Sequence, residues 1–458
     1  MTEARMFDNT PRQGEIIKTR YRKITTPLPH PDTLGVLAAL KAWEPVSMSG
    51  QPPIVWDRAQ GFQVYDAAGN CWIDFSSGVL VANCGHNPPE LKAALIDQIE
   101  NGVIFSYCFP NRPRAELVTK LVKLAGGRID RCFLLTTGGE AVENAIKLAR
   151  TWGKATGGNS KRVIVSFEGA FHGRTLGAQL AGGIPALKDW IGMENTGFVT
   201  VPFPDEATGK NVHFADFLAA LASRNIAEAD VCGVIMESYQ GGTGRFYPQP
   251  FMQELRRWAD AHDALYIADE VQAGFGRTGR MFTFQHYDVE PDMICCGKGL
   301  SGGLPISAVL GNSRFMSLYK PGEMTSTHSG HPLCARAALT SLQLIEEKRL
   351  VENSRNMGLL LHEFLKKLRE SNTGIISAVN GRGLLAAILF RRPTGEPDGE
   401  ITMRVVDYCV RHGVMLYAPL GPGGGTVKIN PPLVITEEPL REGLQVFADA
   451  VQASRILA

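Results

Sequence analysis

A lysine in an unusual setting is the first residue of this sequence that could do chemistry. Lys298 stands between two glycines, directly after the strand-like run Asp292–Cys296. Glycine at such a point leaves room for a bulky group to approach the backbone. A lysine amine can form a Schiff base with a carbonyl compound, so the residue is a candidate nucleophile. An ordinary solvated lysine is the alternative, and the segment lacks the Ser or Thr of a P-loop.

An aspartate and a pair of glycines could complete such a site. Asp269 ends the apolar run Ala264–Ala268, where a carboxylate would form a strong charge pair at low dielectric. Gly138 and Gly139 open a predicted helix directly after a strand, so their amides could approach an anion closely. Both features also occur in ordinary structure, because aspartate often caps turns and this helix start matches a capping box.

Together these residues meet the requirements of pyridoxal 5'-phosphate (PLP) chemistry. That cofactor needs a lysine, an acid that keeps its pyridine nitrogen protonated, and amides that hold its phosphate. A competing pattern, G-x-G-x-x-G at Gly274–Gly279, would suggest a NAD-dependent dehydrogenase. The residues after it lack the helix of a dinucleotide-binding unit, so we favour PLP.

The middle of the chain must position these residues. Short apolar runs alternate there with helical patterns such as 251–259, which places Phe251, Leu255 and Trp258 on one face. This alternation is typical of βαβ units and a largely parallel sheet. Asp269 and Lys298 would then lie at the carboxyl edge of the sheet, where open α/β sheets bind ligands.

The two flanks of the chain have a different pattern. Residues 1–85 mix proline-rich extended segments with short strands, and residues 336–458 combine long helices with strands. We therefore predict an α/β protein with a large domain over 86–335. A smaller α+β domain would be formed by 1–85 and 336–458 together.

Composition excludes several classes of protein. The 458 residues include 47 Lys and Arg against 46 Asp and Glu, so no basic excess indicates a nucleic-acid partner. No apolar stretch reaches the length of a membrane span, and the N-terminus lacks a signal-peptide core. The nine cysteines are scattered and never spaced C-x-x-C, which predicts reduced thiols, no metal site and a cytoplasmic protein.

The combined motifs resemble those of a known family. The segments Gly297–Gly299, Asp269–Gly279 and Thr137–Ala145 are similar to those of class III aminotransferases, which include 4-aminobutyrate and ornithine aminotransferases. The resemblance runs from about residue 45 to the C-terminus. It implies fold type I, an obligate homodimer with active sites at the interface, and transfer of an amino group between an amino acid or ω-amine and a 2-oxo acid.

The resemblance also implies a role for each residue that matches a motif. For the cofactor, these are Lys298 (Schiff base and proton shuttle), Asp269 (pyridine nitrogen), Gln272 (ring hydroxyl), Gly138 and Gly139 (phosphate), Phe171 (ring face) and Thr327 (phosphate of the neighbouring subunit). On sequence alone, Phe171 would more often be a core residue and Thr327 a turn residue.

Substrate binding is expected at Arg174, Glu237 and Lys428. Arg174 matches an arginine that grips a carboxylate through two parallel hydrogen bonds, with a salt bridge as the alternative. The sequence departs from the family at two positions: Gly242 replaces a gating glutamate, and Lys428 replaces the arginine that this glutamate masks. Lys428 either receives an α-carboxylate or is simply solvated, and it lacks the bidentate fork of arginine.

The departures leave other PLP reactions open. An amino-acid racemase or epimerase, or a decarboxylating enzyme of the same family, differs in only a few pocket residues. A non-catalytic binding protein is disfavoured because Lys298 and Asp269 are both intact.

Overall fold

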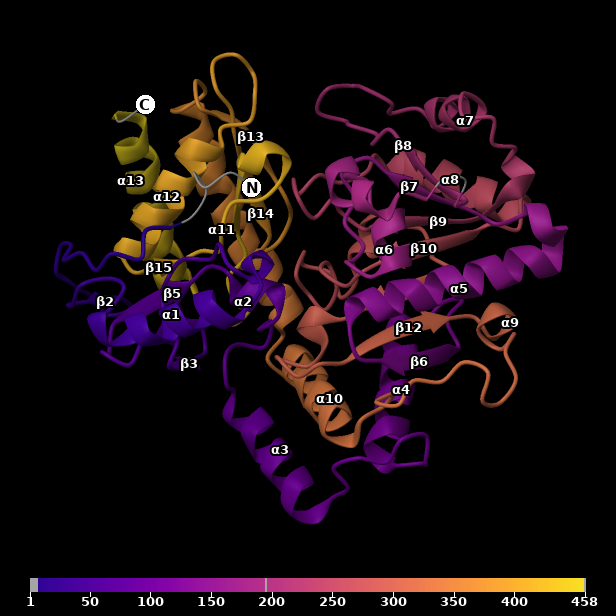
Figure 1. The fold of residues 1–458 in the computed structure, drawn as a ribbon, viewed down its shortest axis with the longest axis horizontal. Helices are drawn as coiled ribbons and strands as arrows, with labels where there is room; N and C mark the ends of the chain where they lie inside the picture. The colour runs from indigo at the N-terminus through magenta and orange to yellow at the C-terminus, as the bar shows by residue number, and fades with distance from the viewer. Residues whose placement is uncertain (1–6, 194–195, 457–458) are drawn as a thin grey trace. The chain divides into compact units, whose positions relative to one another are not determined.

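The computed structural model describes residues 7–193 and 196–456, which group into two compact units (Figure 1). One unit contains Pro89–Val351, and the other joins the residues up to Pro88 with those from Glu352 onward. We refer to them as the large and the small unit. Among the described helices, none is long and apolar enough to cross a membrane.

The large unit is built on a seven-stranded, mainly parallel sheet, as predicted. Its strands run in the order β6 (Arg131–Leu135), β12 (Ser307–Gly311), β11 (Met293–Cys296), β10 (Leu265–Asp269), β9 (Val231–Glu237), β7 (Val163–Phe167) and β8 (Phe198–Val201). Only β12 runs antiparallel to its neighbours. Strands β7, β9, β10, β11 and β12 are buried along their whole length, which explains their continuous apolar runs.

Helices surround this sheet in the large unit. They are α3 (Pro89–Asn101), α4 (Arg112–Ala125), α5 (Gly138–Gly157), α6 (Leu176–Ala181), α7 (Phe214–Ala222), α8 (Gln249–Ala261), α9 (Ser313–Met316) and α10 (Pro332–Glu347). Helix α5 packs across the sheet against β9, β11 and β12 (Figure 1). Helix α8 buries Phe251, Leu255 and Trp258, which confirms the face predicted from their spacing.

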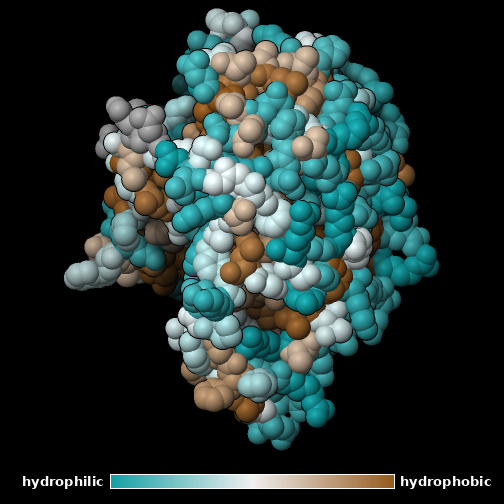
Figure 2. All heavy atoms as spheres, turned by 90° about the vertical axis from the view of Figure 1, so that its right-hand side faces the viewer, coloured by the Kyte–Doolittle hydropathy of each residue, from teal (hydrophilic) through white to brown (hydrophobic). Residues whose placement is uncertain are grey.

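Apolar groups on the face drawn in Figure 2 are scattered among hydrophilic ones, as on most protein surfaces.

The domain boundary after the sheet differs from the one expected at residue 336. Helix α10 packs against α3 and α4, so it belongs to the large unit rather than to the C-terminal part of the small one. The helical periodicity of α10 says where its apolar face lies, but not which neighbour covers that face. The first boundary falls after Pro88, against 85 in the prediction.

The small unit combines both ends of the chain. One sheet has the order β1 (Ile17–Lys18), β2 (Lys23–Ile24), β5 (Cys71–Asp74), β4 (Gln63–Tyr65), β3 (Arg58–Gln60), with β15 (Val414–Met415) on β5; the other contains β13 (Ile376–Asn380), β14 (Ala386–Phe390) and β16 (Thr426–Ile429). Its helices are α1 (Leu34–Trp43), α2 (Ser77–Leu80), α11 (Leu350–Glu370, which spans the boundary), α12 (Gly399–Arg411) and α13 (Glu437–Ile456). The β5–β15 pairing joins the N-terminal and C-terminal segments directly.

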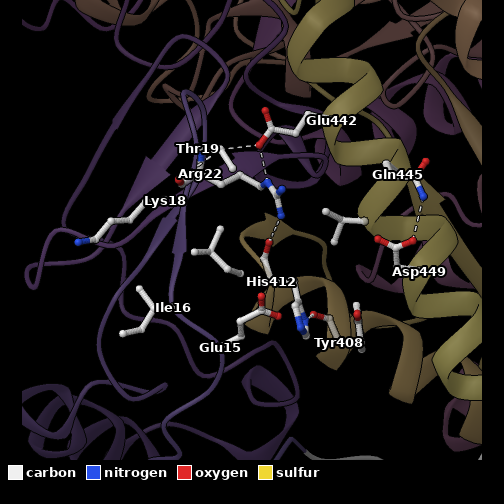
Figure 3. A pocket seen from close by; sticks show the side chains of 12 residues that line it. Glu15, Ile16, Lys18, Thr19, Arg22, Tyr408, His412, Glu442, Gln445 and Asp449 are labelled. Carbon is white, nitrogen blue, oxygen red and sulfur yellow. Dashed lines mark hydrogen bonds and ion pairs between the residues drawn. The ribbon is translucent and has the colours of Figure 1, made fainter.

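A cavity of about 570 Å³ in the small unit lies where the N-terminal segment meets α12 and α13 (Figure 3). Arg22 links the three elements there. Its Nε donates to Glu442 Oε1 at 2.6 Å and its Nη1 donates to the His412 carbonyl at 2.6 Å. Thr19 Oγ1 donates to the same Glu442 oxygen at 2.6 Å. The side chains of Arg22 and Glu442 are only 13% and 22% exposed, so water screens their ion pair weakly.

We expect Arg22→Met to lower the free energy of unfolding by about 1–3 kcal/mol, because Glu442 and the His412 carbonyl would lose a charged donor in a half-buried place. Urea denaturation followed by circular dichroism measures this change. Lys18→Met, at an exposed position on the wall of the same cavity, is the matched control and should change the value by less than about 0.5 kcal/mol. Equal effects of the two substitutions would contradict the assignment.

Candidate active site

Two carboxylates lie side by side at the carboxyl edge of the large sheet. Asp269, the last residue of β10, is paired in register with Glu237, the last residue of β9. The side chain of Asp269 is only 5% exposed. Its Oδ1 accepts a hydrogen bond from the Val271 amide at 3.1 Å, and its Oδ2 lies 2.7 Å from His172 Nδ1. A buried charge requires such partners, because burial otherwise favours the neutral form.

His172 is a site residue that the sequence reasoning missed. Its side chain is fully buried, and its second ring nitrogen, Nε2, has no hydrogen-bond partner within 7–193 and 196–456. The sequence held one signal, since a histidine directly between Phe171 and Gly173 interrupts a segment already expected at the cofactor. The partner of His172 lies 97 residues away, so no local pattern could identify it.

Glu237 holds two loops by their backbone. Its Oε2 accepts from the Phe171 amide and its Oε1 from the Gly241 amide, both at 3.0 Å. Burial raises the pKa of Glu237 to about 7, and the neighbouring charge of Asp269 also raises it, while His172 lowers it. The carboxyl therefore titrates near neutral pH.

Lys298 follows β11 in a turn with a left-handed backbone, φ 40°. Burial lowers the pKa of Lys298, while the charges of Asp269 and Glu237 oppose that shift. A lowered pKa increases the fraction of neutral amine, which is the nucleophilic form. The preceding Gly297 is closely packed, since a Cβ atom there would lie 3.3 Å from Val271 Cγ1.

The start of α5 is closely packed at Gly138. A Cβ atom at Gly138 would lie 2.6 Å from Val271 Cγ1, so a larger residue does not fit without movement. Thr137 and Glu140 form the predicted capping box, with Glu140 Oε2 accepting from the Thr137 amide at 2.8 Å. The following amides at Gly138 and Gly139 have no carbonyl partner within the helix, which is the geometry that binds phosphate.

Other predicted site residues have varied positions. Phe171 is 37% exposed, so its alternative reading as a core residue is wrong, and the Arg174 guanidinium lies 5.5 Å from its ring centroid. Gln272 accepts a hydrogen bond from the Tyr239 hydroxyl at 2.8 Å. Thr327 is exposed in the large unit. Lys428 belongs to the small unit, on β16, and is only 2% exposed, so its alternative reading as a solvated lysine is wrong.

These residues supply the groups that PLP needs from a protein. Lys298 supplies an amine whose pKa is lowered, and Asp269 supplies a buried carboxylate. The start of α5 presents the amides of two glycines at a helix N-terminus, which suits a phosphate group. The described part of the chain contains no cluster of three or more His, Cys, Asp or Glu that could hold a metal ion.

Comparison with known proteins gives a consistent family. The aminotransferase class-III model matches residues 46–451. Mitochondrial ornithine aminotransferase from Rattus norvegicus is 34% identical over 399 residues, covering 86% of this chain and 85% of the relative. The 4-aminobutyrate aminotransferase of Mycobacterium leprae is 32% identical over 444 residues, covering 93% and 97%.

Solved structures agree with this likeness. Ornithine aminotransferase from Toxoplasma gondii ME49 superposes with a TM-score of 0.82 at 26% identity, covering 92% of this chain and 96% of that one. A second structure of the Toxoplasma gondii enzyme, with a TM-score of 0.81 at 27% identity, is described with PLP at its active site and covers 92% of this chain and 95% of that one.

Relatives named as aminotransferases do not favour the racemase or decarboxylase alternatives. The chain belongs to the class III aminotransferases, and it is a PLP-dependent enzyme that moves an amino group between an amino acid or ω-amine and a 2-oxo acid.

Proposed function

We propose that the amino donor is an ω-amino acid, whose carboxylate binds Arg174 far from the reacting amine. The observation that carries this proposal is the state of Arg174. Its side chain is exposed beside Phe171, and no carboxylate of the described residues lies within ion-pair distance of it. A free guanidinium suits a substrate carboxylate, which it binds through two parallel hydrogen bonds.

The names of relatives support the same substrate class. They include ornithine aminotransferase, 5-aminovalerate aminotransferase and 4-aminobutyrate aminotransferase. Each of the three named compounds carries an amine and a carboxylate at opposite ends of a short chain. A 2-oxo acid with a second carboxylate, such as 2-oxoglutarate, would present the same charge to Arg174 in the second half-reaction.

Around the cofactor, we propose the roles expected from the motifs. Bound PLP supplies an electron sink for the substrate carbon. Lys298 holds the cofactor covalently, and its Nζ then moves a proton at the substrate, which a lowered pKa favours. Asp269 pairs with the pyridine nitrogen, and Gln272 lies near the ring hydroxyl. Phe171 stacks on the ring face, and Gly138 and Gly139 bind the phosphate of the same subunit. Thr327 reaches the phosphate in the neighbouring subunit.

Glu237 and Lys428 were both expected to bind substrate, and their surroundings support different roles. Because both Glu237 oxygens accept backbone hydrogen bonds, we propose that Glu237 positions the Phe171 and Gly241 loops instead of contacting substrate. Lys428 lies on β16 and is only 2% exposed, and its role in binding a substrate carboxylate stays a prediction from the motif.

The homodimer is supported by an apolar patch between α3 and α4. We define it as Val103, Ile104, Phe105, Tyr107 and Phe109, whose exposed fractions are 54%, 51%, 46%, 41% and 73%. Clusters of exposed apolar side chains usually mark interaction surfaces. A second copy of this chain is the occupant that also explains the predicted role of Thr327. All nine cysteines are free thiols, which supports a reducing compartment such as the cytoplasm.

Replacing Arg174 by methionine tests the substrate class. In single-turnover reactions without an acceptor, we expect the apparent dissociation constant of 5-aminovalerate to rise about tenfold to a hundredfold, because a charge-assisted hydrogen bond is lost. Pentylamine, which has the same chain length without a carboxylate, is the matched donor and should show no change. An equal loss for both donors would contradict the role of Arg174. A wild-type protein that converts no amine to its carbonyl product would contradict the function itself.

Replacing Glu237 by glutamine tests its burial. The pKa of Glu237 in the folded protein, about 7, is above its ordinary value of 4.5, so the folded state holds an extra proton between these two values. The stability from the protonated form is therefore present below about pH 4.5 and lost as the pH rises through 7. Glutamine does not titrate, so the variant serves as the reference at each pH. The free energy of unfolding of the wild type minus that of Glu237→Gln should fall by about 2–3 kcal/mol between about pH 5 and pH 8. Urea unfolding at several pH values measures this, with Glu15→Gln at an exposed position as control. A difference that stays constant with pH would refute the expectation.

Replacing Phe109 by glutamate tests the dimer, since a charge at the most exposed residue of the patch opposes its burial. We expect sedimentation velocity to show a dimer for the wild type and a monomer for Phe109→Glu at micromolar concentration. Leu359→Glu, outside the patch and 69% exposed, should leave the dimer intact. A wild type that sediments as a monomer would exclude the homodimer.

A further inference from the structure

A tyrosine beyond the end of β9 is hydrogen-bonded to Gln272, in the turn that follows β10. Tyr239 is only 1% exposed and comes two residues after β9. Its hydroxyl donates to Gln272 Oε1 at 2.8 Å. A buried tyrosine hydroxyl usually finds a hydrogen-bond partner, and here the partner is a side-chain amide that can rotate. The bond therefore acts on the conformation of Gln272.

The two ends of the Gln272 amide differ in chemistry but hardly in size. The oxygen only accepts hydrogen bonds, whereas the nitrogen carries two hydrogens and donates. Rotation about the last side-chain torsion exchanges the two ends, and the preferences of this torsion are roughly two-fold. Packing alone would therefore leave both orientations of the amide open.

The backbone at Gly241 packs against both ends of this amide. A Cβ atom at Gly241 would lie 3.1 Å from Gln272 Oε1 and 3.3 Å from Gln272 Nε2. Gly241 is itself held in place, because its amide donates to Glu237 Oε1 at 3.0 Å. These contacts locate the Gln272 amide, but their nearly equal distances do not select which end points in which direction.

The hydroxyl of Tyr239 makes this selection. A phenol is a better donor than acceptor, because its oxygen lone pair is delocalised into the ring, so it favours the amide oxygen as its partner. The position of the hydroxyl is well defined. The ring of Tyr239 stacks on Phe246 with centroids 5.8 Å apart and 26° between the planes, and Phe246 lies edge-on to His286 at 5.9 Å.

We propose that Tyr239 is a positioning residue that orients the Gln272 amide so that Nε2 donates to the ring hydroxyl oxygen of PLP. This inference rests on the proposed place of Gln272 near that oxygen and deepens it. A donor at the ring oxygen favours its ionised form, so the proton that this oxygen shares with the Schiff-base nitrogen stays on the nitrogen. Tyr239 acts on the cofactor through Gln272.

The visible spectrum of the holoenzyme reports where this proton lies. PLP bound to a lysine absorbs in a yellow band when the Schiff-base nitrogen carries the proton, and in the near ultraviolet when the ring oxygen carries it. Tyr239→Phe keeps the ring and removes only the hydroxyl. We expect the ratio of the yellow to the near-ultraviolet band at neutral pH to fall about fivefold, the change that one hydrogen bond of ordinary strength makes in an equilibrium.

Tyr287→Phe is the matched control. Tyr287 packs on the same Phe246 ring, and its hydroxyl donates to the Ser238 carbonyl at 2.6 Å. This variant loses a hydrogen bond beside Tyr239 but leaves the donor on Gln272 in place, so its band ratio should equal that of the wild type. An equal fall in both variants would trace the change to loosened packing and overturn the proposal. If Tyr239→Phe does not fold, Tyr239→Met takes its place.

A substitution of Gln272 separates the two levels of the inference. Gln272→Met should lower the band ratio as Tyr239→Phe does, and the double variant should show no further fall, because both changes remove the same donor from the ring oxygen. If Gln272→Met leaves the ratio unchanged, the proposed place of Gln272 is wrong and the inference fails with it. If Gln272→Met lowers the ratio and Tyr239→Phe does not, only the role of Tyr239 is overturned.

Discussion

Burial of the Asp269 charge is the constraint on which the rest of the site depends. A carboxylate that is 5% exposed needs hydrogen-bond donors or cations around it. Two donors come from different segments, the Val271 amide just beyond β10 and the imidazole of His172. The charge of Asp269 in turn raises the pKa of Glu237 and opposes the lowering at Lys298. Burial is the largest cause of both pKa shifts, and the charge of Asp269 modifies each of them.

The site also depends on glycines, which let the start of α5 and the turn of Lys298 pack close to the loop after Asp269. Val271 lies within contact range of the Cβ positions of both Gly138 and Gly297. The start of α5 and the turn of Lys298 therefore meet at one side chain of the loop that follows Asp269. Gly173 plays the same part against Gly139. A Cβ atom at Gly138 would lie 2.6 Å from Val271 Cγ1 and force a movement there, whereas at Gly173 and Gly297 the neighbours would have to give by only a few tenths of an ångström.

Features with a local cause could be predicted from the sequence. The periodicity of Phe251, Leu255 and Trp258 fixes which face of α8 is apolar. The apolar runs before Asp269 and Lys298 place the first at the end of β10 and the second in the turn just after β11. The mainly parallel sheet follows from the same alternation. In these cases neighbours in the chain are also neighbours in the structure, so spacing alone carries the information.

Features with a distant cause could not be predicted in this way. The bond from His172 to Asp269 and the packing of α10 on α3 and α4 join segments far apart in the chain. Val79 is a further case: a β-branched residue disfavours a left-handed backbone, yet it has φ 63°. The turn that contains it is held from outside by Ser77, whose hydroxyl donates to the Asn430 carbonyl at 2.5 Å. Backbone propensity is a property of one residue type, whereas these conformations and contacts depend on a second segment that is distant in the chain.

Burial also acts in opposite directions on the carboxyl groups and the amine at and beside the end of β10. It raises the pKa of Glu237 and of Glu270 to about 7 and lowers the pKa of Lys298. Glu270 has the same backbone anchoring as Glu237, because its oxygens accept from the amides of Thr283 and Phe284 at 2.9 and 2.8 Å. The lowered pKa of Lys298 increases the fraction of neutral amine, which is the form that can accept a proton at a substrate carbon. This shift follows from enclosing the ends of β9, β10 and β11 in the interior of the large unit.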